Sequence, residues 1–319
     1  MATAVPAAAD RPRPQAPPRP RAADGSLRRV GVELEYGGPD CVAVGGLLRD
    51  LWGGRLVVEG AKCVRVCGSE LGDFKVELDW TAAHLADDLP PEGPERDLGD
   101  RLKAGLATVI GNIGALFMPY EVVAPPVPFD RLDEFDRLTD GLRALGASDT
   151  RSDPTHAYAL QLNPEVDSTD PADLLALLRA YLLSSEGLRA DIGIDFTRRL
   201  IQLAQRFPEG YRRQVLEPAY APDLRQFMAD YVAANPSRNR ELDLLPLFRW
   251  LDEEHLARLT DMKHVKARPT WHWRLPNCLL GDPAWSISRE WNRWVEVERL
   301  AADRDRLERL SREALRSGQ

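Results

Sequence analysis

Long apolar runs are absent from this 319-residue sequence, and so is an excess of positive charge. No stretch reaches the roughly 18 consecutive apolar residues that a membrane-spanning helix needs, so we expect no association with a membrane. Lysine and arginine total 42 against 50 acids, which leaves a formal net charge of -8. Domains that bind nucleic acid by bulk charge are basic, so this balance predicts no nucleic-acid partner.

Cysteine is scarce as well, with four residues in the whole chain. So few thiols build no disulfide framework, and we interpret them as reduced side chains of a cytoplasmic protein. Cys63 and Cys67 have a spacing that zinc can use, but no second Cys or His pair at ligand spacing follows them. We therefore interpret both as packing residues.

The common nucleotide-binding and hydrolase motifs are missing too. The sequence has no GxxxxGKS/T loop, no GxGxxG turn after a strand and no GxSxG elbow. Any use of ATP therefore has to rely on a fold without a P-loop. The cysteine and serine pattern also offers no catalytic nucleophile.

Proline, in contrast, is abundant, with 25 residues, and it gathers at the start of the chain. Residues 1–26 alternate proline with alanine and arginine, which favours extended, solvated chain. We expect a disordered tail there, followed by a single catalytic domain over 27–319 with a helical second half and a charged C-terminal helix. Apolar residues make up 44% of the chain, which is enough for a core.

Two-residue alternation of apolar side chains predicts strands, and a spacing of three to four predicts helices. Strands are expected over 29–36, 55–58, 62–66, 73–80, 120–123, 157–163 and 270–275. Helices are expected over 40–52, 97–116, 131–145, 171–185, 191–203 and 222–234, and from Asp282 toward residue 316.

Acidic residues recur on the strand faces that lie opposite the apolar ones. Glu33 and Glu35, then Glu77 with Asp79, and then Glu121 hold such positions. Residues two apart on a strand share a face, so neighbouring strands would gather these carboxylates. Crowded carboxylates repel one another unless a cation neutralises them, and oxygen ligands favour magnesium or manganese. The alternative is a polar face turned to water, which antiparallel sheets commonly have.

Amide and imidazole side chains extend this pattern. Gln161 and Asn163 have the same two-residue spacing and stand between apolar neighbours. His272 alternates with two tryptophans, so it shares a strand face with Arg274. We expect these residues to face a ligand; for His272 a purely structural role is the alternative.

Arginines form a second group of candidates. Arg238 and Arg240 stand close together, and Arg268 and Arg274 flank an aromatic segment. Guanidinium groups suit bidentate recognition of phosphate or carboxylate. Set against an acidic, metal-binding face, they would complete a site for a polyphosphate and a carboxylate substrate, while surface ion pairing is the alternative.

Six segments together resemble the amidoligase family of the glutamine-synthetase-like carboxylate-amine ligases. They are GVELE at 31–35, VELD at 76–79, EVVAPP at 121–126, LNPEV at 162–166, NPSRNRELDLLPLF at 235–248 and RPTWHWRLPNC at 268–278. The resemblance covers about residues 28–300, and the combination is far more specific than any one segment.

This resemblance implies an α+β fold, with a curved, mainly antiparallel sheet packed against helices, and an ATP- and magnesium-dependent ligase. The substrate carboxylate of such an enzyme attacks the γ-phosphate to give an acyl phosphate, and an amine then displaces phosphate. Small-molecule or peptide carboxylates and amines are the implied partners, and the oligomeric state is left open. The residues carried over are Glu33, Glu35, Glu77 and Glu121 as metal ligands, Gln161, Asn163, Arg240 and His272 as cofactor-binding residues, and Arg238, Arg268 and Arg274 as catalytic residues.

The sequence departs from the family pattern at Gln161, where relatives have histidine. Glutamine offers an oxygen to a metal, but it neither titrates nor acts as a cation. Two alternatives therefore stand beside the ligase. One is a metal-dependent phosphotransferase or phosphohydrolase that uses the same acidic face. The other is a catalytically degenerate member that binds nucleotide.

Overall fold

The computed structural model describes residues 11–60, 62–78, 119–149, 158–193, 204–236, 239–263 and 265–317. Nine strands in these ranges form one antiparallel sheet with open edges at β2 and β8. They are β1 Arg29–Tyr36, β2 Arg55–Gly60, β3 Cys63–Ser69, β4 Gly72–Leu78, β5 Tyr120–Val123, β6 Val127–Pro128, β7 Leu160–Pro164, β8 Leu242–Asp243 and β9 His272–Trp273. Their order is β2-β3-β4-β5-β1-β7-β9-β8, with β6 paired to β1. The expected α+β class and antiparallel pairing are confirmed.

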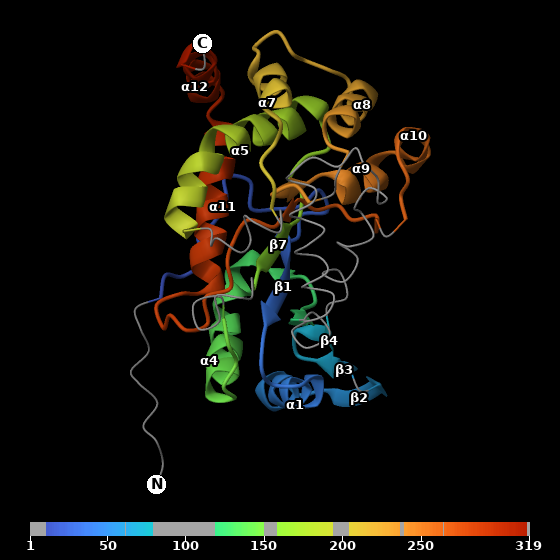
Figure 1. Cartoon of the computed structure of the whole chain (residues 1–319), viewed down its shortest axis with the longest axis vertical. Helices are drawn as coiled ribbons and strands as arrows, with labels where there is room; N and C mark the ends of the chain where they lie inside the picture. The colour runs from blue at the N-terminus through green and yellow to red at the C-terminus, as the bar shows by residue number, and fades with distance from the viewer. Residues whose placement is uncertain are drawn as a thin grey trace, which may run out of the picture.

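Helices of the described residues pack on and around this sheet. They are α1 Cys41–Trp52, the 3₁₀ helix η1 Phe129–Phe135, α4 Asp136–Ala144, α5 Pro171–Ile192, α7 Glu209–Leu216, α8 Leu224–Ala234, α9 Leu245–Leu251, α10 Glu253–Leu259, α11 Ile287–Ala302 and α12 Arg304–Ser317. Figure 1 shows β1 and β7 in the middle of the molecule, with α4, α11 and α5 along one side. None of the described helices is long and apolar enough to cross a membrane.

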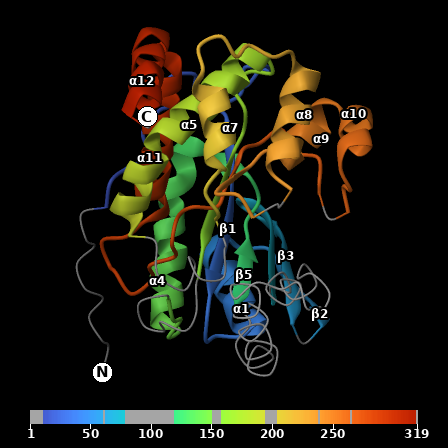
Figure 2. The same cartoon turned by 45° about the horizontal axis from the view of Figure 1, so that its top comes forward.

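Strand β1 lies at the centre of the sheet, between β5 and β7, and Figure 2 shows β1 and β5 side by side. Its alternating pattern was predicted from the sequence and is confirmed. Val30, Val32, Leu34 and Tyr36 are buried in the core at 0–1% exposure. Successive side chains of a strand point to opposite faces, so the glutamates of β1 belong to the other, polar face.

The apolar face of the sheet is covered by helices that carry large aromatic residues. Trp52 of α1 stacks on Phe74 of β4 with ring centroids 5.3 Å apart, and Phe135 meets both rings edge-on. Helix α1 begins after Asp40, whose side chain caps it by accepting a hydrogen bond from Ala43 N. This packing fixes one face of the sheet and leaves the opposite face to the polar residues.

The chain before β1 lies against α11, although its composition predicts a disordered tail over 1–26. Gln15 donates its backbone N–H to the Asn292 side chain over 2.8 Å, and Trp291 Nε1 donates to Gln15 O over 2.9 Å. Asn292 also donates to Arg13 O. Extended proline-rich chain has unpaired backbone groups, and here polar side chains of α11 bind several of them within residues 11–26.

The predicted long C-terminal helix is two helices, and it starts later than expected. The sequence suggested Asp282 as its cap, but Trp285 N bonds Asp282 O in a turn, and Ser286 caps α11. Asp303 interrupts the helix and accepts a hydrogen bond from Arg306 N, so it caps α12. The predicted helix over 97–116 lies outside the described residues, as do residues 194–203 of the helix predicted over 191–203, whose first two residues belong to α5.

Candidate functional site

The polar face of the sheet brings three of the predicted carboxylates into one line. Glu77 of β4 is the direct partner of Glu121 of β5, and Glu121 is the direct partner of Glu35 of β1. Directly opposed residues of antiparallel strands share a face, with Cβ atoms about 5 Å apart. We call Glu77, Glu121 and Glu35 the acid row.

A second row runs beside the acid row, two residues further along each strand. Lys75 of β4 pairs with Val123 of β5, and Val123 pairs with Glu33 of β1. Glu33 in turn pairs with Gln161 of β7. We call Lys75, Val123 and Glu33 the second row; it places a cation at one end and an acid at the other.

Glu33 is held by donors from two other segments. Its Oε1 atom accepts hydrogen bonds from Asn163 Nδ2 over 2.9 Å and from Arg268 Nη1 over 3.1 Å. Its Oε2 atom accepts one from Gln161 Nε2 over 3.0 Å. The side chain is 17% exposed. Three predicted site residues therefore meet Glu33, whose carboxylate neutralises Arg268 and fixes both amides.

Two carboxylates of the acid row are also bound within the protein. Glu35 accepts the backbone N–H of Ala159 over 2.7 Å, and Glu77 pairs with Lys75 over 2.5 Å. Like charges repel, whereas N–H donors and ammonium groups attract each carboxylate separately. In the described ranges, no three His, Cys, Asp or Glu side chains are placed to hold a metal ion together. The acid row is thus in register, but Glu35 and Glu77 bind separate partners.

Gly31 makes room for one of the contacts at Glu33. It pairs with Asn163 across β1 and β7, and a Cβ atom at Gly31 would lie 3.2 Å from Asn163 Cβ and 3.4 Å from its Nδ2. Because glycine lacks that atom, the Asn163 side chain can lie over the strand and reach Glu33.

Strand β9 adds a histidine to the same face, and the residue after it, Arg274, lies close by through Asp243. His272 Nδ1 lies 3.3 Å from Gln161 Nε2, and His272 is only 6% exposed. Arg274 Nη2 donates to Asp243 Oδ2 over 2.9 Å, and Asp243 is fully buried and opposite His272 in register. Sequence reasoning missed Asp243. The signal for it was an acid inside an otherwise apolar run, LDLLPLF.

The structure gives the other predicted arginines different surroundings. Arg268 joins the site through Glu33, whereas Arg240 donates to Arg206 O over 2.6 Å and to Gln205 Oε1 over 3.3 Å. Burial lowers the pKa of the Arg240 guanidinium. Arg240 therefore holds the chain at residues 205–206. The candidates Arg238 and Asp79 lie outside the described residues.

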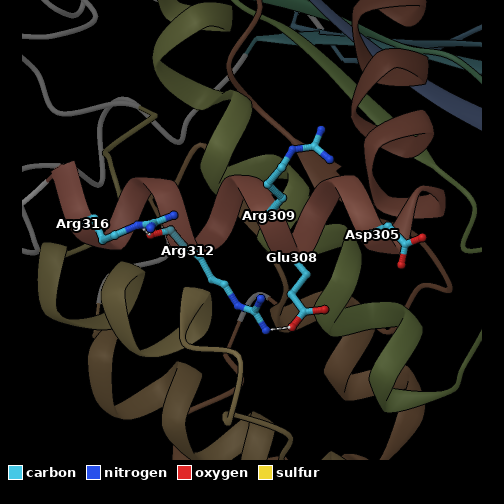
Figure 3. A pocket seen from close by; sticks show the side chains of 5 residues that line it. All are labelled: Asp305, Glu308, Arg309, Arg312 and Arg316. Atoms are coloured by element: carbon cyan, nitrogen blue, oxygen red, sulfur yellow. Dashed lines mark hydrogen bonds and ion pairs between the residues drawn. The ribbon is translucent and has the colours of Figure 1, made fainter.

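A surface hollow in the described part of the chain lies elsewhere, on α12. Its lining residues are Asp305, Glu308, Arg309, Arg312 and Arg316. Figure 3 shows Glu308 paired with Arg312, while Arg309 points away from that pair. None of these residues belongs to the sheet, so the hollow is separate from the polar face.

The antiparallel sheet thus places carboxylates of neighbouring strands in register, with Arg268 bound to Glu33 beside them. A model of the family described as "Putative amidoligase enzyme" matches residues 26–296, so the chain belongs to this family of ligase-type enzymes. Searches of the curated proteins and of the solved structures found no match. The glutamine-synthetase-like part of the expected fold therefore stays a prediction.

Proposed function

We propose that this protein is an ATP- and magnesium-dependent carboxylate-amine ligase that forms an amide or peptide bond through an acyl phosphate. The observation that carries the proposal is the acid row, in which three neighbouring strands each contribute one carboxylate at the same level. Family membership supports the ligase class.

The donor set of the acid row fits magnesium. It consists only of carboxylate oxygens, which hard divalent cations prefer. Glu35, Glu77 and Glu121 would hold the ion once Glu35 and Glu77 turn from Ala159 and Lys75, while Glu33 is already engaged by Arg268 and two amides. Bound there, magnesium would neutralise phosphate charge and polarise the γ-phosphoryl group.

The chain's own residues would bind and orient the reactants. Arg268 is held by Glu33 and Arg274 by Asp243, so both guanidinium groups enter the reaction already positioned. Positioned cations stabilise the charge that develops on a transferring phosphoryl group. Gln161 and His272 lie beside them and would contact the nucleotide or the substrate.

The proposed reaction has two steps. A carboxylate oxygen of the substrate attacks the γ-phosphorus, and the bond to the leaving ADP breaks. The amine nitrogen of the second substrate then attacks the acyl carbon, loses a proton, and displaces inorganic phosphate. No nucleophilic side chain is required, because charge neutralisation and positioning do the chemistry.

The substitution Glu35→Gln tests the metal assignment. The glutamine carbonyl can still accept the Ala159 N–H, so the fold should persist while the charge is lost. We expect ADP release with paired carboxylate and amine substrates to fall at least a hundredfold. Glu186→Gln is the matched control, because Glu186 is 64% exposed and pairs with Arg206 on the surface. Full activity of Glu35→Gln would refute the metal site.

Labelled oxygen distinguishes the ligase from its alternatives. With ¹⁸O in the substrate carboxylate, ligation must move one label into inorganic phosphate. ATP hydrolysis that needs no acceptor and moves no label would instead indicate a phosphohydrolase. Nucleotide binding without any transfer would indicate the catalytically degenerate member.

A further inference from the structure

Lys75 of the second row contacts Glu77 of the acid row. Its Nζ atom is 2.5 Å from Glu77 Oε2, and both side chains are about 30% exposed, at 29% and 30%. Phe74 and Val76, its neighbours along β4, are fully buried on the other face. The ammonium group is thus a protein cation placed directly on one of the proposed metal ligands.

The neighbours of Lys75 across the sheet limit what else it can do. On the β3 side it pairs with Arg65, which repels it and is itself bound to Glu59 over 2.7 Å. On the β5 side it pairs with Val123, which offers no charge. Glu121 is the diagonal neighbour, at about 7–8 Å between strands. Among these neighbours, the attractive groups all belong to the acid row.

The second row has the layout of a phosphate-binding strip. Lys75 stands at one end, and Arg268 is bound to Glu33 at the other, with half-buried Val123 between them. Lysine has a long flexible stem and three donors, which suit it to phosphate oxygens. A polyphosphate lying on this strip would have the acid row, and any cation in it, directly beside it.

We infer that Lys75 binds the phosphates of the nucleotide and that its ammonium group stays paired with Glu77 until a divalent cation replaces it there. This inference rests on the proposed function. A divalent cation on Glu77 repels the ammonium group, which then turns to the phosphates above the second row. Lys75 thereby opposes binding of the metal alone and favours binding of the metal–nucleotide complex.

Opposite effects of one substitution on two ligands test this role. We expect Lys75→Met to bind Mn²⁺ alone about tenfold more tightly than the natural protein, because a competing cation is gone. The same variant should bind a non-hydrolysable ATP analogue with Mg²⁺ about tenfold more weakly, because a charge-assisted hydrogen bond is lost. Calorimetric titration of the full chain measures both constants without any turnover.

Three further variants make the test specific. Lys75→Arg keeps the charge and should bind Mn²⁺ like the natural protein. Arg65→Met removes the opposite cation, which pairs with Glu59, and should change neither constant. Glu77→Gln should lose Mn²⁺ binding. If Lys75→Met leaves either binding constant unchanged, the inference about Lys75 is wrong. Loss of Mn²⁺ binding in Glu77→Gln would in that case still support the metal site. Normal Mn²⁺ binding by Glu77→Gln overturns both.

Discussion

Gly31 is informative at the residue scale because its missing side chain is part of the site. The Asn163 amide lies over Gly31 and donates to Glu33, which in turn binds Arg268. A single methyl group at position 31 would therefore disturb the Glu33 carboxylate indirectly, by displacing the Asn163 side chain that binds it.

We predict that Gly31→Ala lowers activity about tenfold and the free energy of unfolding by about 1 kcal/mol. The added Cβ would lie 3.2 Å from Asn163 Cβ, so the side chain must shift and its bond to Glu33 weakens. Steady-state kinetics and urea denaturation measure the two effects.

Gly46→Ala in α1 is the control for this prediction. A Cβ atom there meets no atom within 4 Å, and alanine favours a helix, so stability should rise by about 0.5–1 kcal/mol with activity unchanged. Equal activities of the two variants would show that the Asn163 contact does not position Glu33.

The alternation of apolar and polar residues was enough to predict the sheet face on which the glutamates of β1 lie. It placed Glu33 and Glu35 opposite Val32 and Leu34, and the register then aligned Glu35 with Glu121. The partners of single residues were not predictable, because they come from distant segments. The contact of Lys75 with Glu77 was missed, and so were the contacts of Arg240 with residues 205–206.

At the scale of elements, a buried ion pair joins α5 to the chain that enters β8. Arg189 Nη2 lies 2.7 Å from Glu241 Oε2, and the two side chains are 8% and 1% exposed. Burial raises the pKa of Glu241 to about 7 even though Arg189 opposes the shift. The pair holds α5 beside a segment that also carries Arg240 and Asp243.

We predict that Arg189→Met lowers the free energy of unfolding by about 3–5 kcal/mol at pH 8, because it leaves a buried carboxylate unpaired. The loss should shrink toward pH 5. The pKa of Glu241 is already above its unfolded value and rises further without Arg189, so the acid is then protonated in the folded state. Denaturation at several pH values measures this.

Arg206→Met serves as the matched control, because Arg206 also pairs with a glutamate but is 60% exposed, as is Glu186 at 64%. Exposed pairs contribute about 0–1 kcal/mol, so its effect should be small. A pH-independent loss in Arg189→Met would contradict the role given to Glu241.

The start of a helix was predictable where the sequence offers a single candidate for the capping residue. Asp40 and Asp170 open α1 and α5 as expected, and both side chains accept the capping hydrogen bond. Asp282 was misleading, because an Asp-Pro pair also opens turns and Ser286 follows within a few residues. Competing caps at short spacing cannot be ranked without the tertiary packing of Trp285.

At the scale of the whole molecule, Arg28 ties the start of β1 to three other parts of the chain. It is 1% exposed and makes a bidentate pair with Glu298 of α11 over 2.8 and 2.7 Å. It also donates to Glu165 O after β7 and to Arg19 O in the N-terminal segment. Composition alone could not reveal this, since it depends on Glu298, which is 270 positions away.

We predict that Glu298→Gln lowers the free energy of unfolding by about 3–5 kcal/mol and makes trypsin cut the chain faster after Arg21, which unlike Arg19 is not followed by proline. The substitution leaves the Arg28 charge buried without its counter-ion and weakens the anchor of the N-terminal segment. Denaturation and limited proteolysis check the two effects.

Glu296→Gln is the control on the same helix, because Glu296 is 64% exposed and pairs with Arg299 on the surface. It should change stability by less than about 1 kcal/mol. If both variants are equally stable and equally resistant to trypsin, Arg28 does not anchor the segment.

The register of the acid row also bears on how the chain acquires its site. Glu35, Glu77 and Glu121 stand far apart in the sequence and become neighbours only when β5 inserts between β4 and β1. Such non-local pairing comes late, after costly loop closure. A chain emerging from the ribosome therefore holds no part of the aligned row until β5 has been made, and products of synthesis that end before β5 carry none of its charge pattern.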